Sequence, residues 1–537
     1  MYQVQNTKFT IENNIIKGVE EPCPIKNKSN FGQVLFDSIS EYGNRVARIQ
    51  VETGEQRSYK DIKDRSVRCA LWLKKQEIGA EDIVVVCTDN QLDACIPTVA
   101  AVYVGAALNG WVHDYGLEQY RYYMNFLRPK VIFSCQASVS LVQEAAKLEN
   151  VATKIIVYGK HTDLESLSDI MSQQSENEVH KFRPEEKFHP LDPAVIMFSS
   201  GSSGTPKAVV LGYGPLLENI LSFCPTDRVV ALYYSSLMWI SGVALTFNFL
   251  LTGSTVIVHE NFSPRETFKI IEEYEINWTF LSPLALTRCY KENILSDYKL
   301  LSLKTILTGS APLNSTVYRA FKDRYPHVTI VFAYGLSELG SLATYNLGQS
   351  VNSIGFIRPN RQLKVVDVTT RKPFGPNEEG ELCLKSVGMM IGYYKNPIDT
   401  SKIIDEEGWL HTGDLGYYNE DGEIFFVERI KELMRWRSSN VYPIEFERLL
   451  LEHPGVSEVA VVPVPDDVDG DRPMAFVKKY PGTEVNEEEL IELSSAVGKG
   501  LKLWGGVKFV DELPRSVSGK VLRHKLKELA KTYKKEL

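Results

Sequence analysis

Short apolar runs alternate with segments of helical apolar spacing over the first part of the chain. The runs at residues 83–87 and 131–135 are each followed by such a segment, the first reaching Leu108 and the second covering residues 139–148. Strands that alternate with helices form parallel sheets, and ligands bind these sheets beyond the carboxyl ends of the strands. The pattern therefore predicts an α/β fold with functional residues at strand ends.

Two later strands continue this pattern. They are expected at residues 304–307 and 328–333, and they lead into Gly309-Ser310-Ala311-Pro312 and Tyr334-Gly335-Leu336-Ser337-Glu338. Both ends would present small or polar residues on the same side of a sheet.

The pattern changes to strands and turns after Gln362. This part predicts a small β subdomain with a hairpin that turns at Asp421-Gly422. Beyond Arg429 we expect a compact α+β domain. Its predicted helices are 443–451, 487–497 and a basic one from about Val521, and its predicted strands are 459–464, 474–478 and 507–510.

The stretch 229–258 has no charged residue and is long enough to raise the question of a membrane span. It contains Ser235, Ser236, Ser241, Asn248 and the turn Thr252-Gly253-Ser254. These polar residues favour a buried helix followed by a strand, so no transmembrane segment is expected.

A serine- and glycine-rich run follows the apolar segment 194–198. It reads Ser199-Ser200-Gly201-Ser202-Ser203-Gly204 and continues into Thr205-Pro206-Lys207. Glycine lets backbone N–H groups approach an anion closely, and the hydroxyls and the lysine add donors and positive charge. The spacing is not the GxxxxGK[ST] of a P-loop. We interpret the run as a phosphate-binding loop, with a flexible linker as the alternative.

Composition is that of an ordinary soluble globular protein. At 537 residues with 44% hydrophobic and 24% charged residues, two or more domains are expected. The formal net charge is −8 with both signs interspersed, which argues against a nucleic-acid partner. The 8 cysteines include no CxxC pair, so we expect reduced core thiols in an intracellular compartment and no zinc site. The first residues lack the apolar run of a secretory signal.

In their order along the chain, these motifs resemble those of the adenylate-forming superfamily of acyl-CoA synthetases, peptide-synthetase adenylation domains and beetle luciferases. The resemblance extends from about Phe31 to Leu529. Within the superfamily, the chain is similar in particular to insect luciferase-like acyl-CoA ligases and plant coumarate ligases. It implies a large N-terminal adenylation domain, residues 1–428, made of flavodoxin-like parallel-sheet subdomains and a small β subdomain. A hinge at 429–431 and a smaller mobile C-terminal α+β domain at 432–537 would follow.

The resemblance implies sites for ATP and magnesium. The segment from Ser199 to Lys207 resembles the phosphate loop, and Gly309-Ser310-Ala311 resembles the strand end beside adenine. In the segment that begins Tyr334-Gly335, the ring is expected to stack on adenine, Ser337 to contact phosphate and Glu338 to bind Mg²⁺. Asp414 of Thr412-Gly413-Asp414 is expected to take the ribose hydroxyls, together with Arg429; considered alone, Asp414 is equally typical of a turn.

A further implied residue is the catalytic lysine. The segment 514–520, PRSVSGK, is similar to the loop whose lysine, here Lys520, bridges the acyl carboxylate and the α-phosphate. Considered alone, Lys520 is typical of a solvated charge. In the family the small domain then swings about a hinge, here Lys431, so that the thiol of coenzyme A can attack the acyl adenylate.

The chain departs from the family on the coenzyme A face. The usual Lys-Tyr-Lys-Gly is here Arg435-Trp436-Arg437-Ser438. Arginine keeps the charge but not the compact ammonium. Ser438 replaces a glycine beside the pantetheine path, and we expect the serine to be tolerated.

Trp239 and Ser341 are the expected acyl-pocket residues. Trp239 stands where beetle luciferases carry a histidine and some fatty acyl synthetases a tryptophan gate; a core aromatic is the alternative. The resemblance thus implies an AMP-forming acid–CoA ligase for an apolar acid, with medium- to long-chain fatty acids first and aromatic acids second. A luciferase-like oxygenase and a degenerate nucleotide-binding protein are the rival interpretations.

The last residues bear on location. Insect relatives imply a peroxisome, but Lys535-Glu536-Leu537 is not Ser-Lys-Leu, so the cytosol is the alternative. Nothing in the sequence indicates an oligomeric state.

Overall fold

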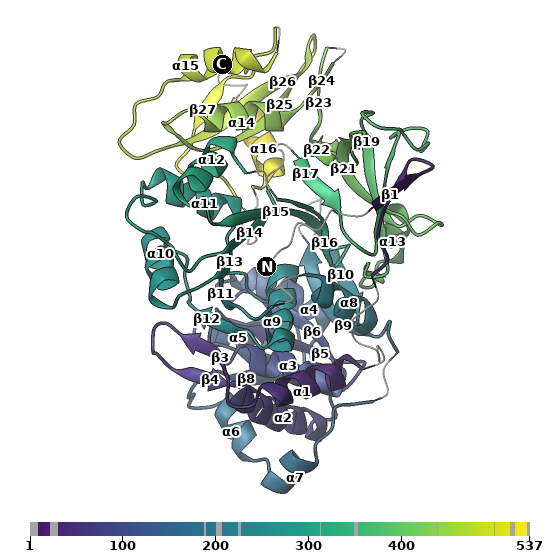
Figure 1. Cartoon of the computed structure of the whole chain (residues 1–537), viewed down its shortest axis with the longest axis vertical. Helices are drawn as coiled ribbons and strands as arrows, with labels where there is room; N and C mark the ends of the chain where they lie inside the picture. The colour runs from purple at the N-terminus through teal and green to yellow at the C-terminus, as the bar shows by residue number, and fades with distance from the viewer. Residues whose placement is uncertain are drawn as a thin grey trace.

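The computed structural model describes residues 9–21, 30–186, 189–199, 207–223, 227–311, 313–347, 353–437, 439–498, 500–515 and 521–533. These residues form two large sheets with their helices and a smaller sheet at one end of the molecule (Figure 1). The arrangement is a mixed α/β fold with a large N-terminal domain and a smaller C-terminal domain. The predicted fold class is therefore confirmed.

The first sheet has seven strands, and five of them are parallel neighbours, as the alternating pattern predicts. In spatial order the strands are β20 (Gly392–Tyr393), β10 (Lys207–Gly212), β9 (Pro193–Ser199), β6 (Ala107–Trp111), β5 (Ile83–Cys87), β7 (Val131–Ser134) and β8 (Lys154–Val157).

Two features of this sheet differ from the prediction. The helical segment expected to reach Leu108 ends at Val104, because Gly105 adopts φ 80° and stops it, and β6 follows at once. Both elements are buried throughout and mostly apolar, so periodicity could not separate them. In addition, β9 does not lead into a helix: the next strand, β10, returns antiparallel to it.

The second sheet has fifteen strands. Its six-strand parallel part runs from β15 to β3, and the remaining pairs are antiparallel. In spatial order the strands are β1 (Phe9–Glu12), β2 (Ile15–Gly18), β18 (Arg361–Val366), β19 (Gly380–Ser386), β21 (Leu410–Tyr418), β22 (Ile424–Arg429), β17 (Ser353–Ile357), β16 (Ser341–Asn346), β15 (Thr329–Leu336), β14 (Thr305–Gly309), β13 (Trp278–Phe280), β11 (Val230–Tyr233), β12 (Thr255–Val258), β3 (Val46–Gln50) and β4 (Gln56–Ser58).

The strand predicted at 328–333 is longer than expected. β15 continues through Tyr334 and Gly335 to Leu336 and pairs with antiparallel β16, with a register shift between Tyr334 and Gly335. The segment predicted to contact adenine therefore begins inside a strand, where backbone pairing holds Tyr334 in place.

The main hydrophobic core lies between the two sheets and the helices that separate them. All ten residues of α3 are buried, as are nine residues of α9. The uncharged stretch forms β11, α9 and β12, so the prediction of a buried helix followed by a strand is confirmed. The N-terminal helices are α1 (Phe31–Tyr42), α2 (Tyr59–Lys75), α3 (Cys95–Val104), α4 (Leu117–Leu127), α5 (Val139–Leu148), α6 (Leu167–Ser172), α7 (Glu176–Lys181), α8 (Tyr213–Phe223), α9 (Ile240–Thr252), α10 (Pro264–Glu273), α11 (Pro283–Lys291), α12 (Ser315–Arg324) and α13 (Pro397–Ile403).

The C-terminal domain is built on the third sheet and carries its own core. The predicted helix 443–451 is present with those bounds, and the other predicted elements occur within a few residues of their expected places. The elements are η1 (Ile430–Glu432), β23 (Met434–Trp436), β24 (Ser439–Val441), α14 (Pro443–Leu451), β25 (Val456–Asp466), β26 (Gly470–Lys479), α15 (Glu487–Ser494), η2 (Ser495–Val497), β27 (Val507–Phe509) and α16 (Arg523–Tyr533).

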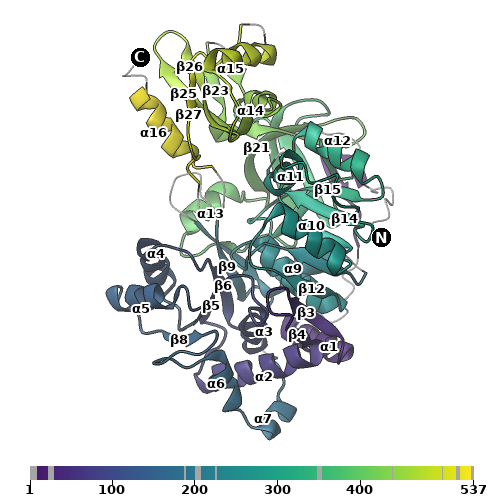
Figure 2. The same cartoon turned by 90° about the vertical axis from the view of Figure 1, so that its left-hand side faces the viewer.

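Contacts between the two domains involve α11 on the N-terminal side (Figures 1 and 2). The ammonium group of Lys291 donates a hydrogen bond to the carbonyl of Val456 and lies 4.6 Å from the ring centroid of Tyr480. Burial lowers the pKa of Lys291 to about 8. Tyr442 also reaches across, with its hydroxyl 3.2 Å from a carboxylate oxygen of Glu379.

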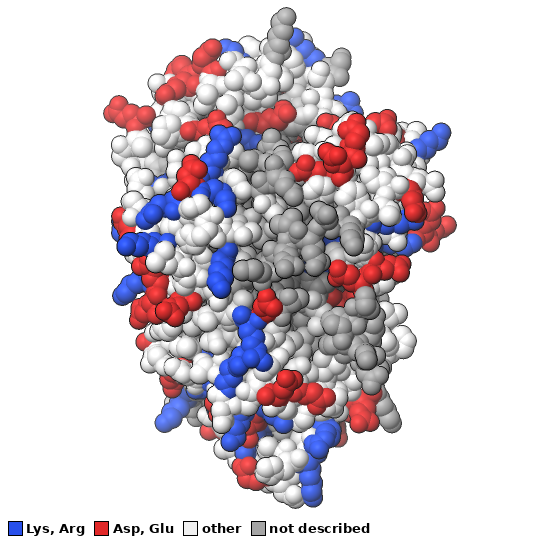
Figure 3. Space-filling model, in the orientation of Figure 1, with Lys and Arg blue, Asp and Glu red and all other residues white. Residues whose placement is uncertain are grey.

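Charged side chains of both signs are interspersed over the face in Figure 3. Six cysteines of the described segments are free and buried. Within the described ranges, none of the helices is long and apolar enough to cross a membrane.

Gly309 gives a test of the packing between β14 and β15. A Cβ at this position would lie 2.2 Å from the carbonyl oxygen of Ala333, so the two strands would have to separate. We expect Gly309→Ala to lower the thermal unfolding midpoint by about 5 °C or more. Gly79→Ala is the matched control, because its new Cβ would meet only Val104 O at 3.9 Å. Equal midpoints for both variants in a calorimetric scan would contradict the packing.

Candidate functional site

A buried carboxylate, Asp414, joins three strands of the large sheet. Its side chain is 0% exposed and lies 2.6 Å from Nε of Arg429, its cross-strand partner on β22. The hydroxyl of Tyr334, on β15, donates a 2.5 Å hydrogen bond to the other carboxylate oxygen. Three predicted site residues that are far apart in sequence therefore meet at one carboxylate.

The protonation states of Tyr334 and Arg429 follow from this geometry. Burial, and then the negative charge of Asp414, raise the pKa of Tyr334 well above its ordinary value. Burial would lower the pKa of Arg429, but the negative charge of Asp414, together with that of its other acidic neighbours, outweighs burial and raises that pKa. The phenol and the guanidinium thus remain donors, and they orient a carboxylate of the kind that can accept hydrogen bonds from vicinal hydroxyls.

A second group lies where the two large sheets meet. The hydroxyl of Tyr393, on β20, donates a 3.0 Å hydrogen bond to Glu338. The ammonium group of Lys207 lies 5.0 Å from the ring centroid of the same tyrosine. Tyr393 therefore connects the lysine of the predicted phosphate loop to the predicted magnesium ligand.

Lys207 is held by an ion pair with Asp399, at 3.1 Å. Asp399 lies in the first turn of α13, which begins after Asn396, whose side chain accepts a hydrogen bond from the Asp399 N–H. Hydrogen bonds from Lys402, and then from Lys207, hold the pKa of Asp399 down at about 2. The pair fixes the ammonium group of Lys207 at the start of β10.

Glu338 fits a magnesium ion in its chemistry. It offers a half-buried carboxylate, and its backbone carbonyl is fixed by a 2.9 Å hydrogen bond from the Met390 N–H. Magnesium is commonly bound by one or two carboxylates together with phosphate oxygens, so this residue is a suitable ligand.

Gly309, Ser310 and Ala311 lie at the end of β14, and Gly309 pairs with Ala333, directly before Tyr334. Ser310 adopts φ 73°, a left-handed conformation that favours glycine. The strand end beside Tyr334 is therefore tightly constrained. Gly335 pairs with Leu342 of β16, and Ser337 is half-buried in the turn that follows β15.

The two predicted acyl-pocket residues lie in different surroundings. Trp239 precedes α9 and packs, half-buried, against a hydrophobic cluster that includes Phe198. Ser341 is 2% exposed and accepts a 2.6 Å hydrogen bond from Arg361. Neither residue lines the small pocket around Arg48 and Asp89.

The predicted hinge and coenzyme A residues lie at the start of the C-terminal domain. Lys431 is in η1. Arg435 is exposed on β23, and its N–H donates to Asp471 at 2.8 Å. Ser438, Lys520 and residues 200–206, which include most of the predicted phosphate loop, lie outside the described residues.

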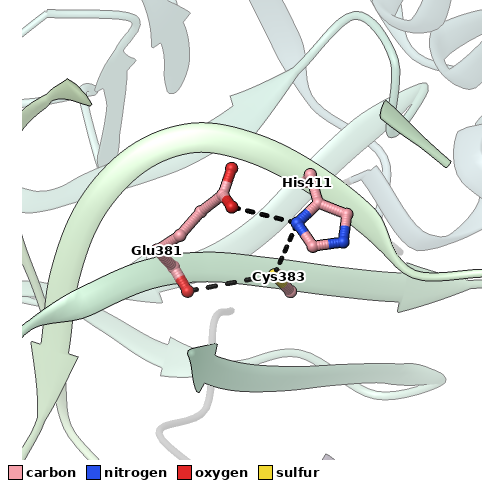
Figure 4. A group of neighbouring side chains, drawn as sticks. All are labelled: Glu381, Cys383 and His411. Carbon is pink, nitrogen blue, oxygen red and sulfur yellow. Dashed lines mark hydrogen bonds and ion pairs between the residues drawn. The ribbon is translucent and has the colours of Figure 1, made fainter. Parts of the chain in front are cut away.

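Sequence reasoning missed Tyr393, Asp399 and a cluster beside Asp414. In that cluster Glu381 and Cys383 of β19 face His411 of β21 (Figure 4). Nδ1 of His411 lies 2.9 Å from Glu381 and 3.4 Å from Cys383. No local spacing links these residues; only their nearness to the Thr412-Gly413-Asp414 motif could have indicated them.

Glu381, Cys383 and His411 are also the only group in the described ranges with a geometry that could hold a metal ion. However, the guanidinium of Arg371 pairs with Glu381 and lies 3.2 Å from Nδ1 of His411. A cation of the protein therefore already contacts two of the three ligand groups, and burial raises the pKa of the Cys383 thiol to about 12. The cluster is best described as a hydrogen-bonded ion-pair network.

Comparisons with known proteins identify the family of this chain. The family model described as AMP-binding enzyme matches residues 35–394, and that described as AMP-binding enzyme C-terminal domain matches residues 445–520. A luciferin 4-monooxygenase from Photuris pensylvanica is 30% identical, with 98% of this chain and 100% of that protein covered. A 4-coumarate–CoA ligase, CCL1, from Humulus lupulus is 28% identical, with 93% of each covered.

Among solved structures, ATP-bound MatB from Rhodopseudomonas palustris shares the fold. The TM-score is 0.83 at 23% identity, with 93% of this chain and 99% of that chain covered. Since the first family model spans more than half of the chain and the second follows it in order, the chain belongs to the AMP-binding, adenylate-forming enzyme family.

Proposed function

We propose that this protein is an ATP-dependent, AMP-forming ligase that joins an apolar carboxylic acid to coenzyme A. The observation that carries the proposal is the buried Asp414, held by Arg429 and Tyr334, which would accept hydrogen bonds from a nucleotide ribose. Membership of a family whose relatives include an enzyme named as a coenzyme A ligase supports it.

In the first proposed step, a carboxylate oxygen of the acid attacks the α-phosphorus of ATP and the bond to pyrophosphate breaks. Both partners are anions, so the site must supply positive charge and hydrogen-bond donors. Lys207, fixed by Asp399, would contact the phosphates, and Lys520 would bridge the acid and the α-phosphate. Magnesium bound at Glu338 would neutralise charge on the departing pyrophosphate.

In the second proposed step, the thiol of coenzyme A attacks the acyl carbonyl and AMP leaves. The C-terminal domain would turn about Lys431, at the junction between β22 and the third sheet. This motion would exchange the Lys520 loop for the face that carries Arg435 and Ser438.

For the acid, we favour medium- to long-chain fatty acids. Trp239 lies directly before α9 and packs against a hydrophobic cluster, so a tail that passes it would meet an apolar wall. Aromatic acids are the second choice, supported by the relative named as a 4-coumarate–CoA ligase. A peroxisomal or cytosolic location stays a prediction from the terminal tripeptide, which lies outside the described residues.

A luciferase-like oxygenase is the second candidate function. It is favoured by the 30% identity to a luciferin 4-monooxygenase over 98% of this chain. Purified protein with luciferin, ATP, magnesium and air would emit light in a luminometer if this activity were present; a dark reaction that still releases AMP would exclude it.

An acid panel tests the ligase proposal. Fatty acids of increasing length and cinnamates should drive ATP–pyrophosphate exchange, with the highest kcat/KM for an aliphatic acid. With coenzyme A present, the thioester should accumulate rather than the acyl adenylate. Absence of exchange with every acid would contradict the ligase. If the reaction instead stops at the acyl adenylate, and Ser438→Gly restores thioester formation, only the expectation that Ser438 is tolerated would be contradicted.

Lys520→Ala separates the two steps. The variant should lose adenylation by roughly 100-fold or more, because one transition-state contact is removed. It should still convert supplied acyl adenylate and coenzyme A to thioester at a rate near that of the wild type. Lys525→Ala, an exposed lysine of α16, is the control and should leave both rates unchanged. Equal loss of both steps in Lys520→Ala would contradict the domain rotation.

A further inference from the structure

The Thr412-Gly413-Asp414 segment is an enlarged bulge of β21. Against β19, Leu415 pairs with Glu381 and His411 pairs with Cys383, so three residues of β21 lie opposite the single residue Leu382. Against β22 the pairing of Asp414 with Arg429 is kept. The bulge therefore changes the orientation of Asp414 relative to β19, while the pairing with β22 holds Asp414 in place.

A bulge leaves backbone groups without ladder partners, and a buried unpaired group is costly. Here side chains take their place. The Thr412 hydroxyl donates to the Leu382 carbonyl at 2.7 Å and accepts the Asp414 N–H at 3.0 Å. A carboxylate oxygen of Glu381 accepts the Gly413 N–H at 3.0 Å.

Glu381 is itself fixed on its other oxygen. That oxygen accepts a 2.9 Å hydrogen bond from His411 and pairs with Arg371. Burial would raise the pKa of Glu381, but the bonds from His411 and Gly413 outweigh it and leave the pKa below its ordinary value. The bond to Glu381 in turn raises the pKa of His411. Glu381 is thus a charged acceptor with a fixed direction.

We infer that Glu381 and Thr412 are positioning residues that set the orientation of Asp414 toward the ribose of a bound nucleotide. They act through the backbone of the bulge and do not contact the nucleotide. The inference rests on the proposed nucleotide site. It adds to that site two residues that act indirectly, through the position of Asp414. Gly413, between Thr412 and Asp414, has φ 69°, a left-handed conformation that favours glycine, so the residue type at this position also supports the bulge.

The variants follow from the hydrogen bonds. Thr412→Val removes the hydroxyl at nearly constant shape, whereas Thr412→Ser keeps the hydroxyl. Both carboxylate oxygens of Glu381 accept hydrogen bonds. Glu381→Gln replaces one of these oxygens with an NH₂ group, which cannot accept, so one of the hydrogen bonds must be lost. Glu406→Gln, an exposed carboxylate in the loop before β21, is the control.

The measurement is the dissociation constant for AMP by titration calorimetry, which needs neither an acid nor coenzyme A. Thr412→Val and Glu381→Gln should each weaken AMP binding by roughly tenfold or more, since a buried hydrogen bond is lost. Thr412→Ser should stay within about threefold of the wild type and Glu406→Gln should match it. The KM for ATP should rise with the dissociation constant, while the KM for the acid stays unchanged.

A double-mutant cycle distinguishes positioning from general support of the fold. If Thr412 acts through Asp414, Thr412→Val should have almost no further effect on AMP binding in an Asp414→Asn background. A purely structural role would instead lower the unfolding midpoint and leave the dissociation constant of the folded protein unchanged.

The outcomes are separable. Wild-type affinity for AMP in both Thr412→Val and Glu381→Gln would overturn the positioning role. An equal loss of AMP affinity from Thr412→Val in the wild-type and Asp414→Asn backgrounds would also overturn it. If Glu381→Gln does not fold, the result for Thr412→Val decides. A wild-type protein that binds AMP but activates no acid would overturn only the ligase. A wild-type protein that binds no AMP would overturn both.

Discussion

The structure of the site depends on one buried charge. Removing a carboxylate from water is expensive unless a partner charge and hydrogen bonds compensate, and Asp414 has Arg429 at 2.6 Å and Tyr334 at 2.5 Å. Because Asp414 and Arg429 are on neighbouring strands and Tyr334 is on a third strand of the same sheet, the carboxylate fixes how these strands approach one another. Arg429 remains 40% exposed, so the pair has one open side.

The other half of the site is assembled across the two large sheets. Lys207 begins a strand of the seven-stranded sheet, whereas Glu338 follows β15 of the fifteen-stranded sheet. Tyr393 lies between them and contacts both, and Asp399 pairs with Lys207. The lysine of the predicted phosphate loop and the predicted magnesium ligand are thus both held by contacts that involve Tyr393 or Asp399.

The fold could largely be predicted from the sequence because its buried elements are strongly periodic. The helix 443–451 is present with its predicted bounds, and the polar residues and turn within 229–258 were enough to predict its buried helix and strand. β6 was missed because a fully buried helix and strand adjoin there with no polar residue to separate them. The antiparallel pairing of β10 with β9 was also missed, because local composition does not determine the direction in which two strands pair.

The site was predicted in part. Tyr334, Asp414 and Arg429 were identified through motifs of a family, and each lies within a few residues of a recognisable strand end. Tyr393 and Glu381 have no such signal, because their roles come from cross-strand contacts between segments that are distant in sequence. Glu381 in particular matters through the backbone of a bulge, which a list of residue types does not reveal.

The most direct measurement compares the binding of AMP and 2′,3′-dideoxy-AMP to the wild-type protein and to Asp414→Asn. If the buried carboxylate accepts the ribose hydroxyls, the wild type should bind the dideoxy nucleotide at least tenfold more weakly, as expected for lost hydrogen bonds to a charged group. In Asp414→Asn the two affinities should converge. Equal affinity of the wild type for both nucleotides would contradict the account.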